Sequence, residues 1–585
     1  IVTKGFAAFN PISFVISFAL SYVVSRMFSK KAPKPVDNGV RQQIPPATTN
    51  SIPMVYGDAY LGGMFVDAAL SQAQNFMYYV MAISSVSPNG QVSFDTNKFY
   101  YGDRLITFDA TDHSKVISLT DQAGNVKTAI KDDLNVYLYK SNAAGVITPL
   151  NTALMPHQVM AYNSADKNTV PAALAWPSSG RQMNGLAFAI IKLHYNSDDQ
   201  ITGLDPVTFH FSQYLNNQGC AKPGDVWVDF LENPYYGGAV DTDLIDTSSA
   251  TALNNYSDQP IPYTPSGGGE LVNQPRYRIN GVLDTGQNVL SNINKILDSC
   301  DSWMQYNAVK GQWSIVINKA ETSSFSFNDD NIVDDIRVST VDLNQSPNQI
   351  EVRFPNSLNK DISDYVYIKT PNELLFPNEP INKLTLDLDM VNNNIQAQYL
   401  GNRILEQARE DLMVTIKTTY EGIQVNAGDV VDITNSYYGW TNKLFRVMKV
   451  NEVAQADSML NAILELSEYN AQVYDNKDIT QFTASGNSDI ANIAYFGALY
   501  APTITDQQPN AAIPSFSVDV ITPSQGQILY VFLYYTTVSS PAQTDWTLWG
   551  TLQATASDPY DGGITLKFPH IGLPTGTYYF AYKVG

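Results

Sequence analysis

The sequence has 585 residues, too many for one hydrophobic core, so we expect a string of about four modules of roughly 150 residues each. Asp and Glu outnumber Lys and Arg by 56 to 35, and the resulting formal charge of −21 argues against direct nucleic-acid binding because it repels phosphate. Two cysteines, Cys220 and Cys300, and five dispersed histidines provide neither a disulfide framework nor metal-ligand spacing.

The first predicted element is an apolar helix within residues 1–30. Residues 11–28 read PISFVISFALSYVVSRMF, with a stripe of small side chains every four residues, at Ser13, Ser17, Ser21 and Ser25. Such a stripe favours close helix packing. About 17 helical residues reach roughly 25 Å, which is marginal for a bilayer core of about 30 Å. We favour a helix buried in an oligomer or channel, and a membrane-active segment or a signal or anchor stay as alternatives.

A proline-rich linker is predicted at residues 31–50, followed by a β-rich module with an insertion at 51–223. Strands are predicted at 75–86, 134–140 and 186–195, where apolar and β-branched residues dominate. This module shows no convincing helical period.

An α+β module is predicted at residues 224–324. Residues 225–231 are amphipathic, residues 287–300 form a helix and residues 311–317 form a strand. The helix prediction rests on apolar positions at i, i+4, i+7, i+8 and i+11, which share one face: Val289, Ile293, Ile296, Leu297 and Cys300.

The next predicted module, residues 325–475, resembles a small barrel or sandwich with one covering helix. The helix is predicted at 395–412, and the strands are predicted at 348–354, 365–369, 428–433, 445–450 and 462–466.

A linker at residues 476–512 leads to an all-β piece at 513–585 whose aromatic residues suggest a fibronectin type III-like sandwich. These aromatic residues are Trp546, Trp549, Tyr578 and Tyr579. The sequence opens without Met and stops within a strand-like run at Gly585, so we expect the protein to extend further.

No constellation of residues predicts catalysis. The sequence contains no Walker loop, no GxGxxG and no GxSxG motif. The acidic groups Asp329-Asp330 and Asp334-Asp335 lack the spacing of a calcium loop and fit a solvated turn. Asp387 and Asp389 alternate along one predicted strand face, as expected for a polar face rather than a glycosidase pair. We expect no enzyme activity, no cofactor and no metal.

Four segments resemble, in order, the central tail hub, or tail-tip attachment and host-specificity protein, of long-tailed bacteriophages. They are residues 52–63 (IPMVYGDAYLGG), 229–238 (DFLENPYYGG), 276–293 (RYRINGVLDTGQNVLSNI) with the Gly-Gln-Trp at 311–313, and 426–474. The last contains NAGDVVDI, a Gly-Trp pair and KLFRV, and ends in ELSEYNAQVY. The resemblance covers roughly residues 10–475.

Together, the predicted modules give a multidomain, mainly β fold with α+β modules, small barrels or sandwiches, an N-terminal apolar helix and a C-terminal fibronectin type III-like domain. The small number of cysteines fits assembly in the host cytoplasm. The resemblance implies a homotrimer at the distal tail tip of the virion. Such a hub closes the tail tube, contacts distal tail proteins, encloses the C-terminal end of the tape-measure protein, links to a receptor-binding fibre, and acts in host attachment and genome ejection.

In such a trimer, three of the apolar helices would lie near the axis and pack through the serine stripe, or would contact the host membrane transiently. Two rival functions are a cell-wall-degrading tail enzyme, against which the lack of an acid/base constellation argues, and a modular β-domain surface adhesin, for which a signal peptide and more repetition are expected.

Overall fold

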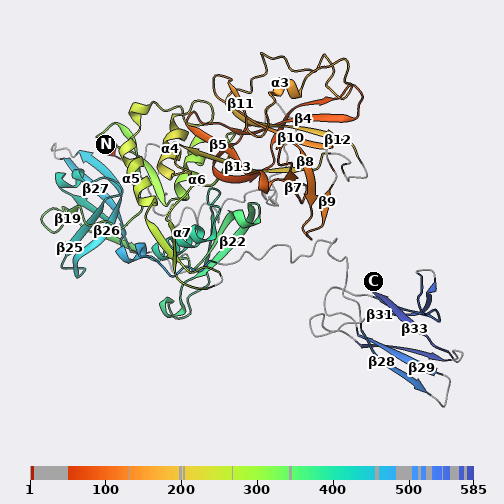
Figure 1. The fold of residues 1–585 in the computed structure, drawn as a ribbon. Helices are drawn as coiled ribbons and strands as arrows, with labels where there is room; N and C mark the ends of the chain where they lie inside the picture. Colours follow the sequence, from red (N-terminus) through yellow and green to blue (C-terminus); the bar gives the residue numbers. More distant parts are fainter. Residues whose placement is uncertain are drawn as a thin grey trace. The chain divides into compact units, whose positions relative to one another are not determined.

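The computed structural model divides into two compact units, Ile1–Ala484 and Ser485–Gly585. In the first unit the structure describes residues 2–4, 51–128, 130, 132–196, 201, 204–215, 217–266, 268–307, 309–340, 346–410, 412–454 and 460–481. In the second it describes residues 503–510, 515–521, 530–542, 545–553, 565–571 and 576–584. The predicted N-terminal helix lies outside the described residues. Strands outnumber helices among the described residues, as predicted for a mainly β fold (Figure 1).

The module after the predicted linker is built on one large sheet, in red to yellow in Figure 1. Among the described residues its order is β11-β10-β12-β4-β2-β13-β6-β7-β8-β9, with β3, β5 and β16 paired to β4, β13 and β2. The strands are β2 (Met54–Leu61), β3 (Met64–Leu70), β4 (Phe76–Ser85), β5 (Gly90–Phe94), β6 (Tyr100–Tyr101), β7 (Arg104–Phe108), β8 (Val116–Thr120), β9 (Val126–Thr128), β10 (Leu134–Ser141), β11 (Ile147–Pro149), β12 (Leu186–His194), β13 (Val207–Leu215) and β16 (Gly281–Leu283).

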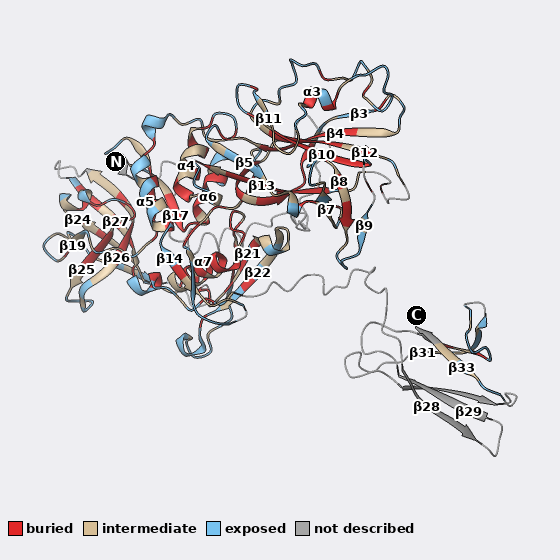
Figure 2. Cartoon of the chain, viewed as in Figure 1, coloured by how far each residue is buried: buried red, intermediate tan, exposed pale blue. Residues whose placement is uncertain are grey.

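The central strands of this sheet are buried on both faces, which explains their continuous apolar sequences (Figure 2). Along β12, Ala189 and Ile191 point into one core, whereas Phe188 and Ile190 point into another. The second core is closed by residues of the 150–185 insertion, including Trp176, after the short helix α3 (Pro156–Val159). The three strands predicted at 75–86, 134–140 and 186–195 are therefore confirmed as β4, β10 and β12.

The central α+β layer has a single core that draws on residues from Met54 to Ile479. Its elements are α4 (Pro223–Glu232), α5 (Thr247–Ser257), β14 (Pro260–Tyr263), β15 (Val272–Pro275), α6 (Val289–Asp298), β17 (Ser302–Asn307), β18 (Gln312–Ile317), β21 (Gln349–Asn356), β22 (Ile362–Lys369), β23 (Lys383–Asp387) and α7 (Asn394–Gln407). The helix predicted at 287–300 is α6, and it begins where the Asn288 side chain accepts a hydrogen bond from the Leu290 amide.

The helix predicted at 395–412 is confirmed as α7, but its predicted end is wrong. The helix α7 ends at Gln407, because residues 412–418 alternate buried and less buried side chains and form the strand β24 instead. Gly401 of α7 packs against Val352 and Ile368 of the β22–β21–β23 sheet, so α7 covers two of the strands predicted for its module and belongs with them to the central layer.

The barrel-like strands form a separate sheet with its own core. Its order among the described residues is β19-β25-β26-β27-β24-β20, with β1 paired to β26. The strands are β1 (Val2–Lys4), β19 (Phe325–Phe327), β20 (Arg337–Thr340), β24 (Leu412–Thr418), β25 (Val430–Asn435), β26 (Trp440–Ala454) and β27 (Leu460–Glu468). We call it the seven-stranded sheet. The predicted 325–475 module is thus divided between two cores, because residues 349–407 join the central layer.

After the seven-stranded sheet the chain returns to the central layer. Ile479 is buried there, and the Thr264 amide donates to its carbonyl over 2.8 Å. The Gln481 amide donates to the Thr264 carbonyl over 2.8 Å, and the Gln398 side chain of α7 donates to the Thr480 carbonyl over 2.9 Å. The last described residues of this unit are therefore anchored on the central layer.

The second unit contains two antiparallel three-stranded sheets in its described residues, β28-β29-β32 and β31-β30-β33. The strands are β28 (Thr503–Asn510), β29 (Ser515–Ile521), β30 (Tyr530–Thr536), β31 (Thr547–Gln553), β32 (Thr565–Ile571) and β33 (Tyr579–Val584). Residues 503–510, predicted as linker, form β28 because they pair with β29. The fibronectin type III-like assignment stays a prediction.

Short 3-10 helices complete the description: η2 (Thr96–Lys98), η3 (Thr242–Leu244), η4 (Ser357–Asn359), η5 (Asn372–Leu374), η6 (Tyr420–Gln424) and η7 (Ala471–Tyr474). Within the described part of the chain, every helix is too short or too polar to cross a membrane.

Candidate functional site

The residues that the sequence singled out do not converge on one site. Cys220 is half-buried and Cys300 is buried, and both are free thiols. Burial raises the pKa of the Cys300 thiol, which donates to carbonyls of its own helix, so Cys300 is a packing residue as predicted. The serine stripe, Ser13, Ser17, Ser21 and Ser25, cannot be placed because it lies outside the described residues.

The acidic residues are also separated. Asp389 does not share a strand face with Asp387, because β23 ends at Asp387, and it instead pairs with Lys295 of α6 at 2.8 Å. Asp329 and Asp330 lie in an exposed turn, as predicted, and the Asn435 side chain donates to Asp329 over 2.8 Å. In the described part of the chain, no group of three or more His, Cys, Asp or Glu side chains is arranged to hold a metal ion.

Two of the four hub-like segments meet at the carboxylate of Asp229. Asp229 on α4 accepts hydrogen bonds from Tyr56 of β2 at 2.6 Å, Ser87 at 2.5 Å and Tyr236 at 2.9 Å. Tyr56 belongs to the IPMVYGD segment, and Asp229 and Tyr236 belong to the DFLENPYYGG segment. Burial and the neighbouring Asp229 raise the pKa of both phenols, so both remain protonated donors.

Two glycines allow this junction to close. At Gly237 a Cβ atom would lie 1.8 Å from the Phe230 carbonyl oxygen, so the turn after α4 packs on the helix only without a side chain. Gly57 has a φ of +72°, and a Cβ there would lie 2.1 Å from the Ile279 carbonyl oxygen. The third hub-like segment, residues 276–293, thus lies directly against the first.

A polar cavity of about 460 Å³ lies beside this junction, where β2, β13, η2 and the turn after η4 come together. Its charged lining residues are three carboxylates and one ammonium, from Asp58, Asp95, Asp361 and Lys98. Asp58 accepts hydrogen bonds from Ser212 at 2.5 Å and Tyr214 at 2.6 Å. These two donors lie on β13 and Asp58 lies on β2, so the hydrogen bonds connect β13 to β2 at the cavity wall.

Local backbone contacts hold the other two carboxylates in place. Asp361 accepts the Tyr60 amide at 2.7 Å, and Asp95 caps η2 by accepting the Asn97 amide at 3.2 Å. Lys98 lies 3.1 Å from Asp95. Burial opposes ionisation of Asp95, but hydrogen bonds from Lys98 and Asn97 lower its pKa overall, so it is charged at neutral pH.

His210 of β13 also lines the cavity. It is 7% exposed and packs edge-on against the Tyr60 ring, with ring centroids 4.6 Å apart. Burial, assisted by Lys98, lowers the pKa of His210 despite the opposing effect of Asp58 and Asp95. The imidazole is therefore neutral at pH 7.

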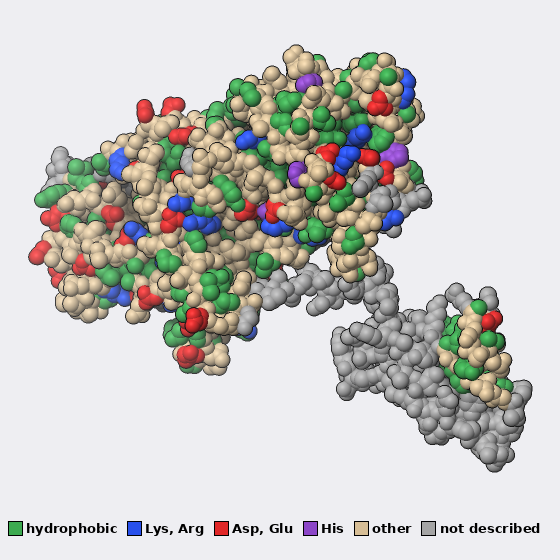
Figure 3. Space-filling model, in the orientation of Figure 1, with side chains coloured by type: hydrophobic (Ala, Val, Ile, Leu, Met, Phe, Trp, Pro, Cys, Tyr) green, Lys and Arg blue, Asp and Glu red, His purple; other side chains and the backbone are tan. Residues whose placement is uncertain are grey.

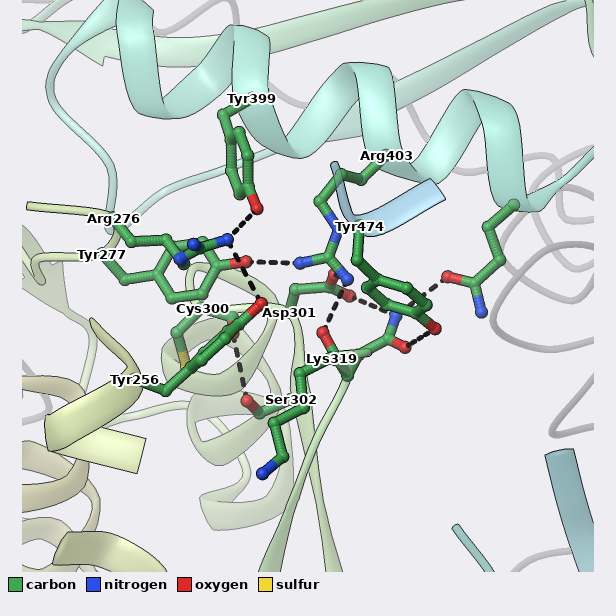
Figure 4. Close-up of polar contacts among 12 residues, drawn as sticks. Tyr256, Arg276, Tyr277, Cys300, Asp301, Ser302, Lys319, Tyr399, Arg403 and Tyr474 are labelled. Carbon is green, nitrogen blue, oxygen red and sulfur yellow. Dashed lines mark hydrogen bonds and ion pairs between the residues drawn. The ribbon is translucent and has the colours of Figure 1, made fainter. Parts of the chain in front are cut away.

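A second polar cluster is enclosed in the first unit, and Figure 4 shows its polar contacts around Arg403 and Asp301. The Arg403 guanidinium of α7 lies 2.8 Å from Asp301, with side-chain exposures of 0% and 1%. It also donates to the Tyr277 hydroxyl at 2.7 Å and to the Asn318 carbonyl at 2.6 Å. We call Arg403, Asp301, Asn318 and Tyr474 the buried joint.

Tyr474 connects this joint to the seven-stranded sheet. Its hydroxyl donates to the Asn318 side chain at 2.8 Å and accepts from Arg446 of β26 at 3.3 Å. Arg446 also donates to the carbonyls of Gly428 at 2.8 Å and Lys319 at 3.1 Å. The Arg446 guanidinium therefore binds the Lys319 carbonyl of the central layer and the Gly428 carbonyl before β25. These two contacts hold the central layer against the seven-stranded sheet.

Local sequence patterns predict few of these contacts. Asp229 and Tyr236 lie in a segment that was recognised, but nothing in the sequence showed that they contact Tyr56. His210 was one of five dispersed histidines, and Arg403 was read as part of an amphipathic helix. One sequence feature could have indicated the buried joint: Arg403 lies on the apolar face of a helix, and a buried Arg needs an acidic partner.

The surface of the first unit offers no large field of one charge on the face shown in Figure 3, where acidic and basic groups are scattered among uncharged ones. This agrees with a charged fraction of 16%. This face therefore offers no basic field that would attract a polyanion.

Comparisons with known proteins address the family. No family model matches the chain. The baseplate hub protein pb3 of Escherichia phage T5 is 24% identical over 496 residues, which cover 75% of this chain and 50% of that protein. The chain thus spans about half the length of the curated relative that it matches.

Solved structures with low overall similarity also come from tail proteins and phage-like particles. A chain of the native gene transfer agent particle aligns with a TM-score of 0.49 and 10% identity over 80% of this chain and 96% of its own length. A tail protein from Neisseria meningitidis MC58 aligns with a TM-score of 0.27 and 12% identity over 46% and 78% of the two chains. These scores add no weight, and the assignment rests on the sequence relationship. That relationship agrees with the resemblance that the four segments indicate: the chain is similar in sequence to the baseplate hub protein of a bacteriophage.

Proposed function

We propose that this protein is the structural hub of a phage tail tip. In this role it closes the distal end of the tail tube, holds the C-terminal end of the tape-measure protein and links the tube to the parts that recognise the host. The observation that carries the proposal is the relationship to a baseplate hub protein over 496 residues. The architecture supports it, because several β-rich cores joined by buried polar contacts form a rigid scaffold.

The proposed assembly is a ring of three copies that contacts distal tail proteins, with the seven-stranded sheet lining the tube. Imaging of the tips of purified virions by cryo-electron microscopy tests this arrangement. Three copies around the tail axis are expected. Six copies, or density for this chain away from the tip, would contradict the proposal.

Tape-measure binding is tested separately by co-expression. The C-terminal segment of the tape-measure protein, carrying an affinity tag, should retain this chain, whereas its N-terminal segment should not. Equal retention by the two segments would contradict tape-measure binding but would not bear on the proposed ring of three copies. Residues 11–28 stay a prediction, with packing at the trimer axis or transient contact with the host membrane as the two alternatives.

We also propose that the protein is not an enzyme. The contacts of the cavity carboxylates support this view: Asp58 accepts two hydroxyl hydrogen bonds and Asp95 lies 3.1 Å from Lys98, so neighbouring side chains already engage each carboxylate. A zymogram on peptidoglycan from the host should show no clearing. A cleared zone that persists in purified protein would restore the cell-wall hydrolase function.

A further inference from the structure

The hairpin between β25 and β26 presents aromatic side chains to solvent. Its residues 435–442 read NSYYGWTN, and we call them the aromatic tip. Tyr437 is 88% exposed and Tyr438 is 38% exposed. Tyr, Ser, Asn and Gly together are the composition of loops that recognise other chains, because Tyr offers a wide contact area with few rotatable bonds. The aromatic tip therefore has the composition of a binding loop.

Side-chain contacts hold the aromatic tip in one conformation. The carboxamide oxygen of Asn435 accepts the amides of Tyr437 at 3.1 Å and Tyr438 at 3.2 Å. The Tyr438 ring stacks on Trp440 with ring centroids 4.8 Å apart, and its hydroxyl donates to the Ile336 carbonyl at 3.1 Å. Because these residues are already ordered, a segment that packs on them binds without the entropic cost of ordering the loop.

An acidic turn lies beside the aromatic tip. The Asn435 side chain donates to Asp329 at 2.8 Å, so residues 329–336, which we call the acidic turn, lie along the hairpin. The turn exposes four carboxylates, those of Asp329, Asp330, Asp334 and Asp335. In the described part of the sheet, two cations offset them: Lys417, which lies 3.5 Å from Asp334, and Arg337, the next residue after the turn. The surface around Tyr437 is therefore aromatic and carries an excess of negative charge.

The sequence contains a segment that complements this surface. Residues 26–41, outside the described residues, carry five cations and one carboxylate, a net charge of +4 in a chain of −21. Within them, residues 29–36 read SKKAPKPV. Proline-rich segments favour the extended polyproline II conformation and pack on aromatic surfaces with little further loss of conformational entropy. The basic charge of the segment also matches the acidic turn.

The chain is long enough to bring this segment to the aromatic tip within one copy. β1 pairs with residues 450–452 of β26, the strand that begins at Trp440. Ten strand residues between positions 440 and 450 cover roughly 34 Å. Residues 5–28 would cover roughly 36 Å even if all of them were helical. A segment that starts at residue 29 can therefore reach the tip from β1.

We propose that the aromatic tip and the acidic turn bind the proline-rich segment 29–36 of this chain. Pro33 and Pro35 pack on the rings of Tyr437 and Tyr438, and the lysines of the segment face the carboxylates of the acidic turn. Exposed ion pairs contribute little individually, but a tethered segment has a local concentration in the millimolar range, so weak contacts are sufficient. The inference is independent of the proposed hub function, because the contact requires no other tail protein.

Site-specific photo-cross-linking in the full chain tests the proposal. p-Benzoylphenylalanine is incorporated in place of Tyr437, which is exposed and tolerates the change, and cross-linked peptides are identified by mass spectrometry. Cross-links to residues 29–36 are expected. The matched control carries the same photo-reactive residue in place of Tyr235, which is 89% exposed after α4, and should not reach that segment. The mass of the product on a denaturing gel separates a contact within one copy from a contact between copies.

Charge variants test the contribution of the acidic turn. The triple variant Lys30→Glu, Lys31→Glu and Lys34→Glu should lower the cross-link yield about tenfold, because it reverses the charge that the turn attracts. Asp330→Asn combined with Asp335→Asn should lower the yield severalfold. Asp121→Asn, in the turn between β8 and β9, removes a charge elsewhere and should leave the yield unchanged.

A competition experiment separates the proline-rich sequence from its charge. A synthetic peptide of residues 26–41, added in excess to the full chain, should displace the tethered segment and lower the cross-link yield. A peptide of the same composition in scrambled order should compete less. Equal competition by the two peptides would reduce the contact to a charge effect and overturn the docking of the proline-rich sequence.

Two further results would contradict the proposal. One is a set of cross-links from position 437 that excludes residues 29–36, or no cross-link at all from that position. The other is equal labelling of residues 29–36 from positions 437 and 235. Thermal unfolding of each variant shows whether a lost cross-link reflects lost binding or lost fold.

Discussion

Arg403 on α7 and Asp301 before β17 form an ion pair of 2.8 Å that is sealed from solvent on both sides. Two charges are stable in such a place only as a pair, because each alone would have to give up its hydration without compensation. The pair is surrounded by Tyr277, Asn318 and Tyr474, so it connects the core of the central layer to the seven-stranded sheet.

Replacing one partner of this pair should be far more damaging than replacing both. Arg403→Met should lower the free energy of unfolding by about 3–5 kcal/mol because it strands Asp301. The double variant with Asp301→Asn, which removes the charge and suits the φ of +48° at this position, should recover much of that loss. Urea unfolding of the full chain, followed by tryptophan fluorescence, measures both. Lys115→Met, which breaks the exposed pair with Asp132, should cost less than about 1 kcal/mol. Equal losses from Arg403→Met and Lys115→Met would show that the joint does not stabilise the fold.

Neighbouring tyrosines provide a matched test of the Asp229 junction. Tyr236→Phe removes the 2.9 Å hydrogen bond to Asp229 and should cost about 1 kcal/mol. Tyr235, which is 89% exposed, makes no such contact, and Tyr235→Phe should leave the urea midpoint unchanged. If the two variants unfold alike, the carboxylate of Asp229 does not hold the turn.

The turn after α4 should reject any side chain at Gly237. Gly237→Ala places a methyl group 1.8 Å from the Phe230 carbonyl oxygen, so we expect a loss of about 3 kcal/mol or more, or insoluble protein. Gly124→Ala is the comparison, because Gly124 has open space around it and only an unfavourable φ of +82°, with an expected cost of about 1–2 kcal/mol. Soluble Gly237→Ala protein with a melting temperature equal to that of Gly124→Ala would refute the close contact.

The pH dependence of stability should carry a signature of Asp298 near the end of α6. Burial, with Asp301 and Asp389 adding to it, raises the pKa of Asp298 to about 7. Because the folded state then binds a proton that the unfolded chain releases near pH 4, the Asp298 contribution to stability is full below about pH 4 and is lost as pH rises towards 7.

Asp298→Asn should remove this loss, so the variant gains stability relative to the parent at pH 8 but not at pH 4. Melting temperatures across that range measure the effect. Asp330→Asn, in an exposed turn, serves as the charge control. A constant difference between the Asp298→Asn variant and the parent from pH 4 to 8 would mean that Asp298 does not titrate in this window.

The sequence was informative wherever local periodicity decided the structure. The strands β4, β10 and β12 and the helix α6 follow from runs of apolar residues, because side-chain alternation and helical period are local properties. The assignment of α7 to the central layer was missed because it depends on contacts of Gly401 with Val352 and Ile368, which are far away in the sequence. The polar cavity was missed for the same reason: Asp58, His210 and Asp361 are separated by about 150 residues each, and no spacing rule connects them.

The anchoring of residues 479–481 on Thr264 and α7 determines how tension would travel through the molecule. The last described residues of the first unit lie on the central layer and not on the seven-stranded sheet. A pull applied to the chain after Gln481 is therefore borne first by the backbone hydrogen bonds at Thr264, before it can reach the seven-stranded sheet. Under such a pull, the hydrogen bonds at Thr264 and Gln398 would break before any strand of the seven-stranded sheet is separated from its neighbours.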